Sequence, residues 1–159
     1  HTGGTAHVVG LLSAGGVHAH QDHILAVVNG LAEAGSTVVI HGFTDGRDVL
    51  PRDAGISLQN FVADLPDNAS IGSLTGRYFG MVRDHRWDRT QKAYDAIARG
   101  RAEYHADDAI QALQTGYVRG ESDEFLSATI IGDYAGMRDG DGLVMMNFRA
   151  DRAPNMCYP

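Results

Sequence analysis

The chain has very little lysine, cysteine or tryptophan, and it has no long apolar run. Lys92, Cys157 and Trp87 are each the only residue of their kind among 159. A single cysteine excludes an internal disulfide, and the N-terminus shows no secretory signal, so we expect a cytoplasmic protein. No stretch approaches the roughly 18 apolar residues that a membrane span needs. The composition therefore favours one globular domain over residues 1–159, with no membrane partner.

Positive charge is scarce, and almost all of it is arginine. The net charge is −7, which argues against nucleic acid or an anionic membrane as a partner. Arginine grips carboxylate or phosphate with two parallel hydrogen bonds, which lysine cannot do. A GC-rich genome would explain twelve arginines beside one lysine, but not where they fall. Five follow apolar runs: Arg47, Arg77, Arg83, Arg149 and Arg152.

Strand-like and helix-like segments alternate along the chain. Apolar runs predict strands over 7–13, 37–43, 69–75, 128–132 and 143–148. Segments with a period near 3.6 predict helices over 19–34, 53–64, 88–99 and 107–118. This alternation predicts an α/β fold, with a mainly parallel or mixed sheet and helices on both faces.

Four of the predicted strands run into clusters of Gly, His, Asp or Arg. Open α/β sheets place ligand sites just beyond the carboxyl ends of their strands. The four junctions therefore predict one shared pocket that holds the five arginines, one histidine and several carboxylates. Such a pocket suits a small, highly anionic ligand.

Residues 18–23 spell H-x-H-x-D-H, which is also the signature of metallo-β-lactamase-type hydrolases. Imidazole and carboxylate are suitable zinc ligands. However, no later histidine recurs at a comparable strand exit, and that fold is normally longer than this chain. We therefore expect no metal here. His20 and His23 then lie in the first helical turns, the helix dipole favours Asp22 there, and His18 faces the pocket.

Five blocks of the sequence resemble the cofactor-independent phosphoglycerate mutases, in the same order and with similar spacing. They are LLSAGGVHAHQDHI (11–24), HGFTDGRDVLPRDA (41–54), GRYFGMVRDHRWDRTQKAYDAI (76–97), ESDEF (121–125) and DGDGLVMMNFRADRA (139–153). The likeness runs from about residue 7 to residue 153. Three departures are Ala14 where the family commonly has Asp, a short loop near 132–138, and the tail after Ala153.

The resemblance implies a role in interconverting 2- and 3-phosphoglycerate, in glycolysis and gluconeogenesis, through a phosphoserine intermediate. In that family a phosphatase-like domain carries the nucleophilic serine and two manganese ions, and an inserted domain holds the glycerate. This chain looks like the inserted domain alone, because the serine precedes it and a lysine and most manganese ligands follow it. The fragment is then inactive by itself, and the phosphatase-like domain is its partner.

The resemblance also implies a set of substrate contacts. They are His18, Arg47, Asp48, Arg77, Arg83, Arg149 and Arg152. Asp48 is our candidate for moving the proton of the glycerate hydroxyls. Its alternative role is a turn cap or an ion-pair partner of Arg47 or Arg52, and Asp45, Asp84 and Asp151 are expected to be structural. A stand-alone module that binds small anions remains a second hypothesis for the whole chain.

Overall fold

A computed structural model describes residues 3–84 and 86–149. The strands are β1 (Ala6–Leu12), β2 (Val38–Thr44), β3 (Ala69–Gly76), β4 (Tyr104–Ala106), β5 (Thr129–Ile131) and β6 (Gly142–Met145). The helices are α1 (Gln21–Glu33), α2 (Ala54–Ala63), α3 (Arg77–Gly80), α4 (Trp87–Arg99), α5 (Ala109–Val118) and the 3₁₀ turn η1 (Asp123–Phe125). None of the helices in the described ranges is long and apolar enough to cross a membrane.

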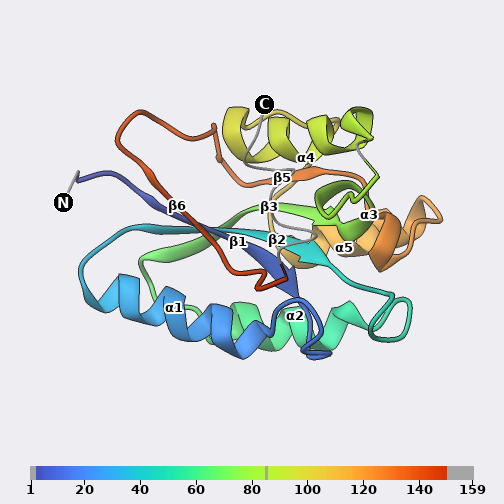
Figure 1. Cartoon of the computed structure of the whole chain (residues 1–159), viewed down its shortest axis with the longest axis horizontal. Helices are drawn as coiled ribbons and strands as arrows, with labels where there is room; N and C mark the ends of the chain where they lie inside the picture. Colours follow the sequence, from blue (N-terminus) through green and yellow to red (C-terminus); the bar gives the residue numbers. More distant parts are fainter. Residues whose placement is uncertain (1–2, 85, 150–159) are drawn as a thin grey trace.

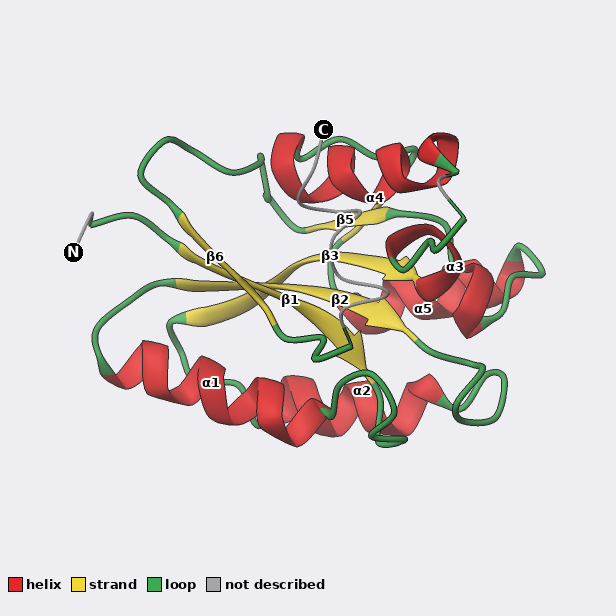
Figure 2. Cartoon of the chain, viewed as in Figure 1, coloured by secondary structure: helices red, strands yellow, loops and turns green. Residues whose placement is uncertain are grey.

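One six-stranded sheet organises the chain, in the order β4-β5-β3-β2-β1-β6. Its neighbours are parallel except β3 and β5, which run antiparallel. Helices α1 and α2 lie below the sheet in Figure 1 and α4 lies above it, while α5 packs beside α2. Figure 2 shows the same layers coloured by secondary structure. The predicted mixed α/β sheet with helices on both faces is confirmed.

The helices begin and end where local chemistry allows. His20 precedes α1, and its ring nitrogen accepts a hydrogen bond from the backbone N–H of Asp22. Asp108 caps α5 in the same way, by accepting from the backbone N–H of Gln111. At the other end of α4, Gly100 takes a left-handed conformation with φ of 59°, which glycine adopts without strain.

Three short elements and one boundary differ from the sequence prediction. The alternation of apolar residues did not predict β4, α3 or η1, because each has four residues or fewer. Strand β6 ends at Met145 and not at residue 148. There the side chain of Asn147 replaces a backbone partner, since its Oδ1 accepts from the N–H of Leu11 at 3.0 Å.

The register of the central strands places their carboxyl ends side by side. Leu12 of β1 pairs with Thr44 of β2, and Thr44 pairs with Gly76 of β3. The three residues that follow these ends are Ser13, Asp45 and Arg77. They therefore leave the sheet side by side, at the carboxyl ends of the strands.

Candidate functional site

An ion pair between two buried side chains lies at the centre of the site, at the carboxyl ends of the parallel strands. Arg77, the first residue of α3, places Nη1 at 2.5 Å from Asp45 Oδ1. The side chains of Arg77 and Asp45 are 4% and 2% exposed, so water does not screen them. The hydroxyl of Ser13 donates to the other oxygen of Asp45 at 2.5 Å. The residues that directly follow β1, β2 and β3 are thereby joined in one network.

The network keeps both groups charged. Burial alone would raise the pKa of Asp45, but hydrogen bonds from Ser13, the backbone of Asp48 and Arg77 bring it below its ordinary value. Burial would likewise lower the pKa of Arg77, and hydrogen bonds to Asp48 and Asp45 raise it instead. The site therefore keeps a fixed guanidinium at the end of β3.

Asp48 joins the same guanidinium from the loop that follows β2. Its Oδ2 lies 2.6 Å from Arg77 Nη1 and 3.7 Å from Nε2 of the buried His18. The loop is folded by Asp45, whose Oδ1 accepts from the backbone N–H groups of Arg47 at 3.2 Å and Asp48 at 3.0 Å. The ion-pair partner of Asp48 is therefore Arg77, and not Arg47 or Arg52 as the structural alternative supposed.

Two glycines of the sequence motifs let the turn η1 approach the site. A Cβ at Gly46 would lie 2.9 Å from the Cβ of Asp123, and one at Gly76 would overlap the carbonyl oxygen of Glu124. Asp123 is fully buried, and its carboxylate accepts from the N–H of Ala54 at 3.0 Å and from the hydroxyl of Tyr117. The ESDEF block (121–125) therefore packs against the loops of the site and supports them.

The segment that follows β6 reaches the same end of the sheet. The backbone N–H of Phe148 donates to the carbonyl of His18 at 2.9 Å, and the exposed Arg149 follows. Arg152 and Asp151 lie outside the described residues. The structure thus brings together His18, Asp48 and Arg77, with Arg149 next to the residue that contacts His18.

A cleft of about 260 Å³ opens beside Arg77. Its lining holds four arginines: Arg47, Arg77, Arg83 and Arg89. Arg47 is 61% exposed and lies 3.7 Å from Glu124 Oε1, whereas both carboxylates nearest Arg77 are directly bonded to it. Asp84 and Glu124 are the acidic residues of the lining, so arginines outnumber carboxylates there. We call this space the arginine cleft.

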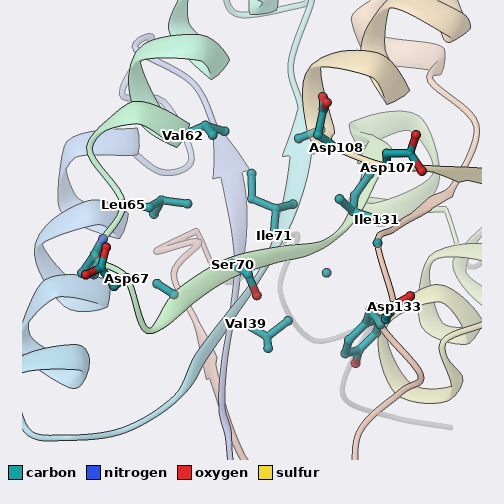
Figure 3. Close-up of a pocket in the computed structure, with 16 residues that line it drawn as sticks. Val39, Val62, Leu65, Asp67, Ser70, Ile71, Asp107, Asp108, Ile131 and Asp133 are labelled. Atoms are coloured by element: carbon teal, nitrogen blue, oxygen red, sulfur yellow. The ribbon is translucent and has the colours of Figure 1, made fainter.

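A larger depression of about 630 Å³ lies at the opposite end of the strands, near the start of β2 and β3 (Figure 3). Its floor is apolar, with Val39, Ile71 and Ile131. Its lining contains no lysine or arginine but four aspartates: Asp67, Asp107, Asp108 and Asp133. We call it the aspartate cleft. Despite its greater volume, its charge opposes an anionic ligand.

The H-x-H-x-D-H run does not gather into a metal site. Within residues 3–84 and 86–149, no group of three or more His, Cys, Asp or Glu side chains could hold a metal ion. His20 caps α1, the ring of His23 lies 5.4 Å from the His20 ring at a tilt of 45°, and His18 lies near Asp48. The metallo-hydrolase alternative therefore has no support in the geometry.

Three contributions to the site were not foreseen from the sequence. No pattern in the sequence indicates Ser13 or Glu124, and Arg89 stands only within a charged stretch. Arg89 comes from the first turn of α4, and no local signal distinguishes it from Arg86 nearby. Asp45, expected to be structural, orients Arg77 and folds the loop that carries Asp48.

Known proteins match this chain over nearly its whole length. The family described as BPG-independent PGAM N-terminus matches residues 1–158. A 2,3-bisphosphoglycerate-independent phosphoglycerate mutase of Dinoroseobacter shibae is 52% identical over 96% of this chain and 30% of its own length. The enzyme of the same name from Yersinia pestis is 50% identical over 96% of the chain and 31% of its length.

A solved structure gives the same result. The crystal structure of Leishmania mexicana phosphoglycerate mutase at low cobalt concentration superposes with a TM-score of 0.88 and 30% identity, over 97% of this chain and 31% of that one. The fold defines an α/β domain, and a cleft lined by arginines lies at its strand ends. The chain belongs to the family of N-terminal domains of 2,3-bisphosphoglycerate-independent phosphoglycerate mutases. It spans about 30% of the length of the curated relatives it matches.

Proposed function

We propose that this chain is the substrate-holding domain of a mutase that interconverts 2- and 3-phosphoglycerate. The observation that carries the proposal is the arginine cleft, in which a buried guanidinium is fixed at the strand ends and three further arginines belong to the lining. The names of the relatives point to the same substrates. Residues 1–159 then act as a single domain of a larger enzyme, in the cytoplasm, where a lone cysteine stays reduced.

Phosphoglycerate carries a carboxylate and a phosphate, about three negative charges in all near neutral pH. Each charge-assisted hydrogen bond contributes roughly 1.5–3 kcal/mol, so a few arginines can retain the ligand. Retention matters because glycerate that escapes after losing its phosphoryl group turns a mutase into a phosphatase. We assign Arg47, Arg77, Arg83, Arg149 and Arg152 to this task.

Asp48 is our candidate for proton transfer. Its carboxylate is held by Arg77 and lies beside His18, so its position in the site is fixed. One Asp48 oxygen takes the proton of the glycerate hydroxyl that attacks the phosphoryl group. The same oxygen gives its proton to the glycerate oxygen from which the phosphoryl group departs, so that this oxygen becomes a hydroxyl. His18 and Arg77 orient the carboxylate between these two steps.

Phosphoryl uptake needs groups that the described part of this chain does not bring together. The described residues form no cluster suited to a metal ion, so they do not fit the two manganese ions that the family resemblance implies. We assign those ions and the serine nucleophile to the remainder of the parent enzyme. No step assigned to this chain's residues passes through a metal.

The purified chain tests the proposal directly. Calorimetry with 3-phosphoglycerate should show binding with a Kd in the millimolar range, about 4 kcal/mol, because the opposite wall of the site is missing. Crystals soaked in sulfate should show density at Arg77 or Arg83. Anions bound only elsewhere on the surface would contradict the proposal.

Turnover separates the proposed role from the alternative of a stand-alone anion-binding module. The chain alone should show no mutase or phosphatase activity, with or without added manganese, and mixing it with the rest of the parent enzyme should restore mutase activity. Binding without restored turnover would favour the module. Steady conversion of 3-phosphoglycerate by the chain alone would overturn the division of labour.

In the full-length parent, Asp48→Asn should separate binding from catalysis. The amide keeps the size of the side chain but cannot accept the hydroxyl proton, so kcat should fall by about 10²–10⁴-fold. Substrate affinity should change little, and a melting curve checks that the fold persists. Unchanged turnover would mean that Asp48 serves only as an ion-pair partner of Arg77.

A further inference from the structure

Arg89 is an arginine of the cleft that the family resemblance did not include among the substrate contacts. It lies in the first turn of α4 and lines the arginine cleft together with Arg83. Its guanidinium carbon lies 4.0 Å from the centre of the Tyr78 ring. Arg89 is half-buried, so the stacked guanidinium is neither in the core nor loose on the surface.

The platform under Arg89 is itself held in place. The Tyr78 ring packs 4.8 Å from the ring of Phe125 in η1 and 5.1 Å from the ring of Phe79. Stacking on an aromatic face uses the π surface of the guanidinium and leaves its N–H groups, which lie in the plane, for other acceptors. The contact with the Tyr78 ring therefore restrains the guanidinium of Arg89 without occupying its donors.

The charge of Arg89 is not neutralised in the way the charges of its neighbours are. Two carboxylates bond to Arg77, and Arg86 pairs with Asp88 at 3.2 Å. Among the ion pairs of the described residues, none includes Arg89. A guanidinium that lines a cleft and forms no ion pair with the described carboxylates is suited to a ligand anion.

We propose that Arg89 is a specificity-determining residue that binds the phosphate group of the ligand, and that Tyr78 is its positioning residue. This inference rests on the proposed function. Phosphate is the group assigned to Arg89 because it carries nearly two charges and three acceptor oxygens. Arg83 and Arg89 both line the cleft and lack a carboxylate ion pair among the described residues, so together they match a dianion.

Calorimetry on the purified chain tests the assignment, with 3-phosphoglycerate and glycerate as the two probes. Arg89→Ala should weaken 3-phosphoglycerate binding by about tenfold, the scale of one charge-assisted hydrogen bond. Glycerate, which lacks the phosphate, should bind the variant and the wild type alike. Arg89→Lys keeps the charge without the stacked fork, so it should recover only part of the loss.

Two further variants distinguish binding from a structural role. Tyr78→Leu should weaken 3-phosphoglycerate binding by a few-fold, because it removes the platform and leaves the arginine, while Tyr78→Phe should bind as the wild type does. Arg86→Ala is the matched control, since Arg86 is already paired with Asp88. It should leave both affinities unchanged.

The outcomes separate this inference from the proposed function. If the wild type binds neither probe, the proposed function fails and this inference fails with it. If the wild type binds 3-phosphoglycerate and Arg89→Ala binds it equally well, only the inference about Arg89 is overturned. Equal weakening of glycerate and 3-phosphoglycerate by Arg89→Ala also overturns it, because the residue would then support the cleft without recognising the phosphate.

Discussion

The two clefts, which lie at opposite ends of the strands, differ in size and in charge. The arginine cleft has a volume of about 260 Å³ and contains four arginines, while the aspartate cleft has about 630 Å³ and contains four aspartates. The smaller cleft is the one that suits an anion. The comparison shows that the volume of a cavity says less about its ligand than the charges at its rim.

The direction of the strands explains the difference. Strands β1, β2 and β3 are parallel, so the loops that follow them meet at the end of the sheet where the arginine cleft lies. Strand β5 runs antiparallel to β3 and parallel to β4. The loops after β4 and β5 carry Asp107 and Asp133. They therefore leave the sheet at the opposite end, where β3 begins. One reversed strand pair separates the acidic loops from the arginines.

Among the variants considered, Arg77→Ala should have the largest effect on stability and on anion binding. It leaves the buried carboxylate of Asp45 without its charge partner, and breaking a buried ion pair in this way typically costs about 3–5 kcal/mol. Urea denaturation should show that loss, and sulfate binding should disappear. Adding Asp45→Asn to this variant should recover part of the stability. A loss below about 1 kcal/mol would contradict the central role given to this pair.

Acid should weaken the sheet between the two clefts. Burial, and then the neighbouring His7, lowers the pKa of His41 from 6.5 to about 3. The unfolded chain thus binds a proton below pH 6.5 that the folded chain does not, so stability falls as the pH falls from 6.5 toward 3. The slope approaches about 1.4 kcal/mol per pH unit, which gives somewhat under 2 kcal/mol between pH 6.5 and pH 5.

The histidine variants isolate this effect. His41 Nδ1 lies 2.8 Å from the hydroxyl of Ser73, and His41 Nε2 lies 3.0 Å from His7 Nδ1, so His41→Gln should lower stability at pH 7 and flatten the slope. His105→Gln, at an exposed position, is the matched control and should keep the slope. Urea midpoints at pH 5, 6 and 7 measure both. An unchanged slope in His41→Gln would assign the acid sensitivity to other groups.

Gly76→Ala should disturb the arginine cleft alone. The added methyl group overlaps the backbone of Glu124 and Leu126, so η1 must move away from the end of β3. Overpacking of this kind costs about 1–3 kcal/mol. Thermal melting should show the loss, and 3-phosphoglycerate should bind more weakly because Glu124 and Phe125 line the cleft. Gly55→Ala, where a methyl group meets no neighbour, is the control.

Asp133→Asn should have the smallest effect. Asp133 is exposed at the rim of the aspartate cleft, and surface substitutions of this kind usually change stability by less than about 0.5 kcal/mol. The affinity for sulfate should remain that of the wild type, whereas Arg83→Ala should reduce it. Equal effects of the two variants would mean that anions respond to the overall charge and not to the arginine cleft.

Much of the fold could be predicted from periodicity and turn residues. The long strands and helices were expected within two or three residues of their observed bounds, because each buries a continuous apolar run or an apolar face. The short elements β4, α3 and η1 could not be expected, since four residues or fewer carry no measurable period. The end of β6 was missed because a side chain of Asn147 takes over the pairing.

The sequence by itself determined that the arginines follow strands, and hence it predicted an arginine-rich pocket at the carboxyl ends of the sheet. Only the tertiary structure decided which carboxylates hold Arg77, since Asp45 and Asp48 are about 30 residues away from it. It also decided that Arg89 enters the cleft and that Asp107 and Asp133 do not. Strand register and strand direction set these contacts, and neither leaves a local pattern in the chain.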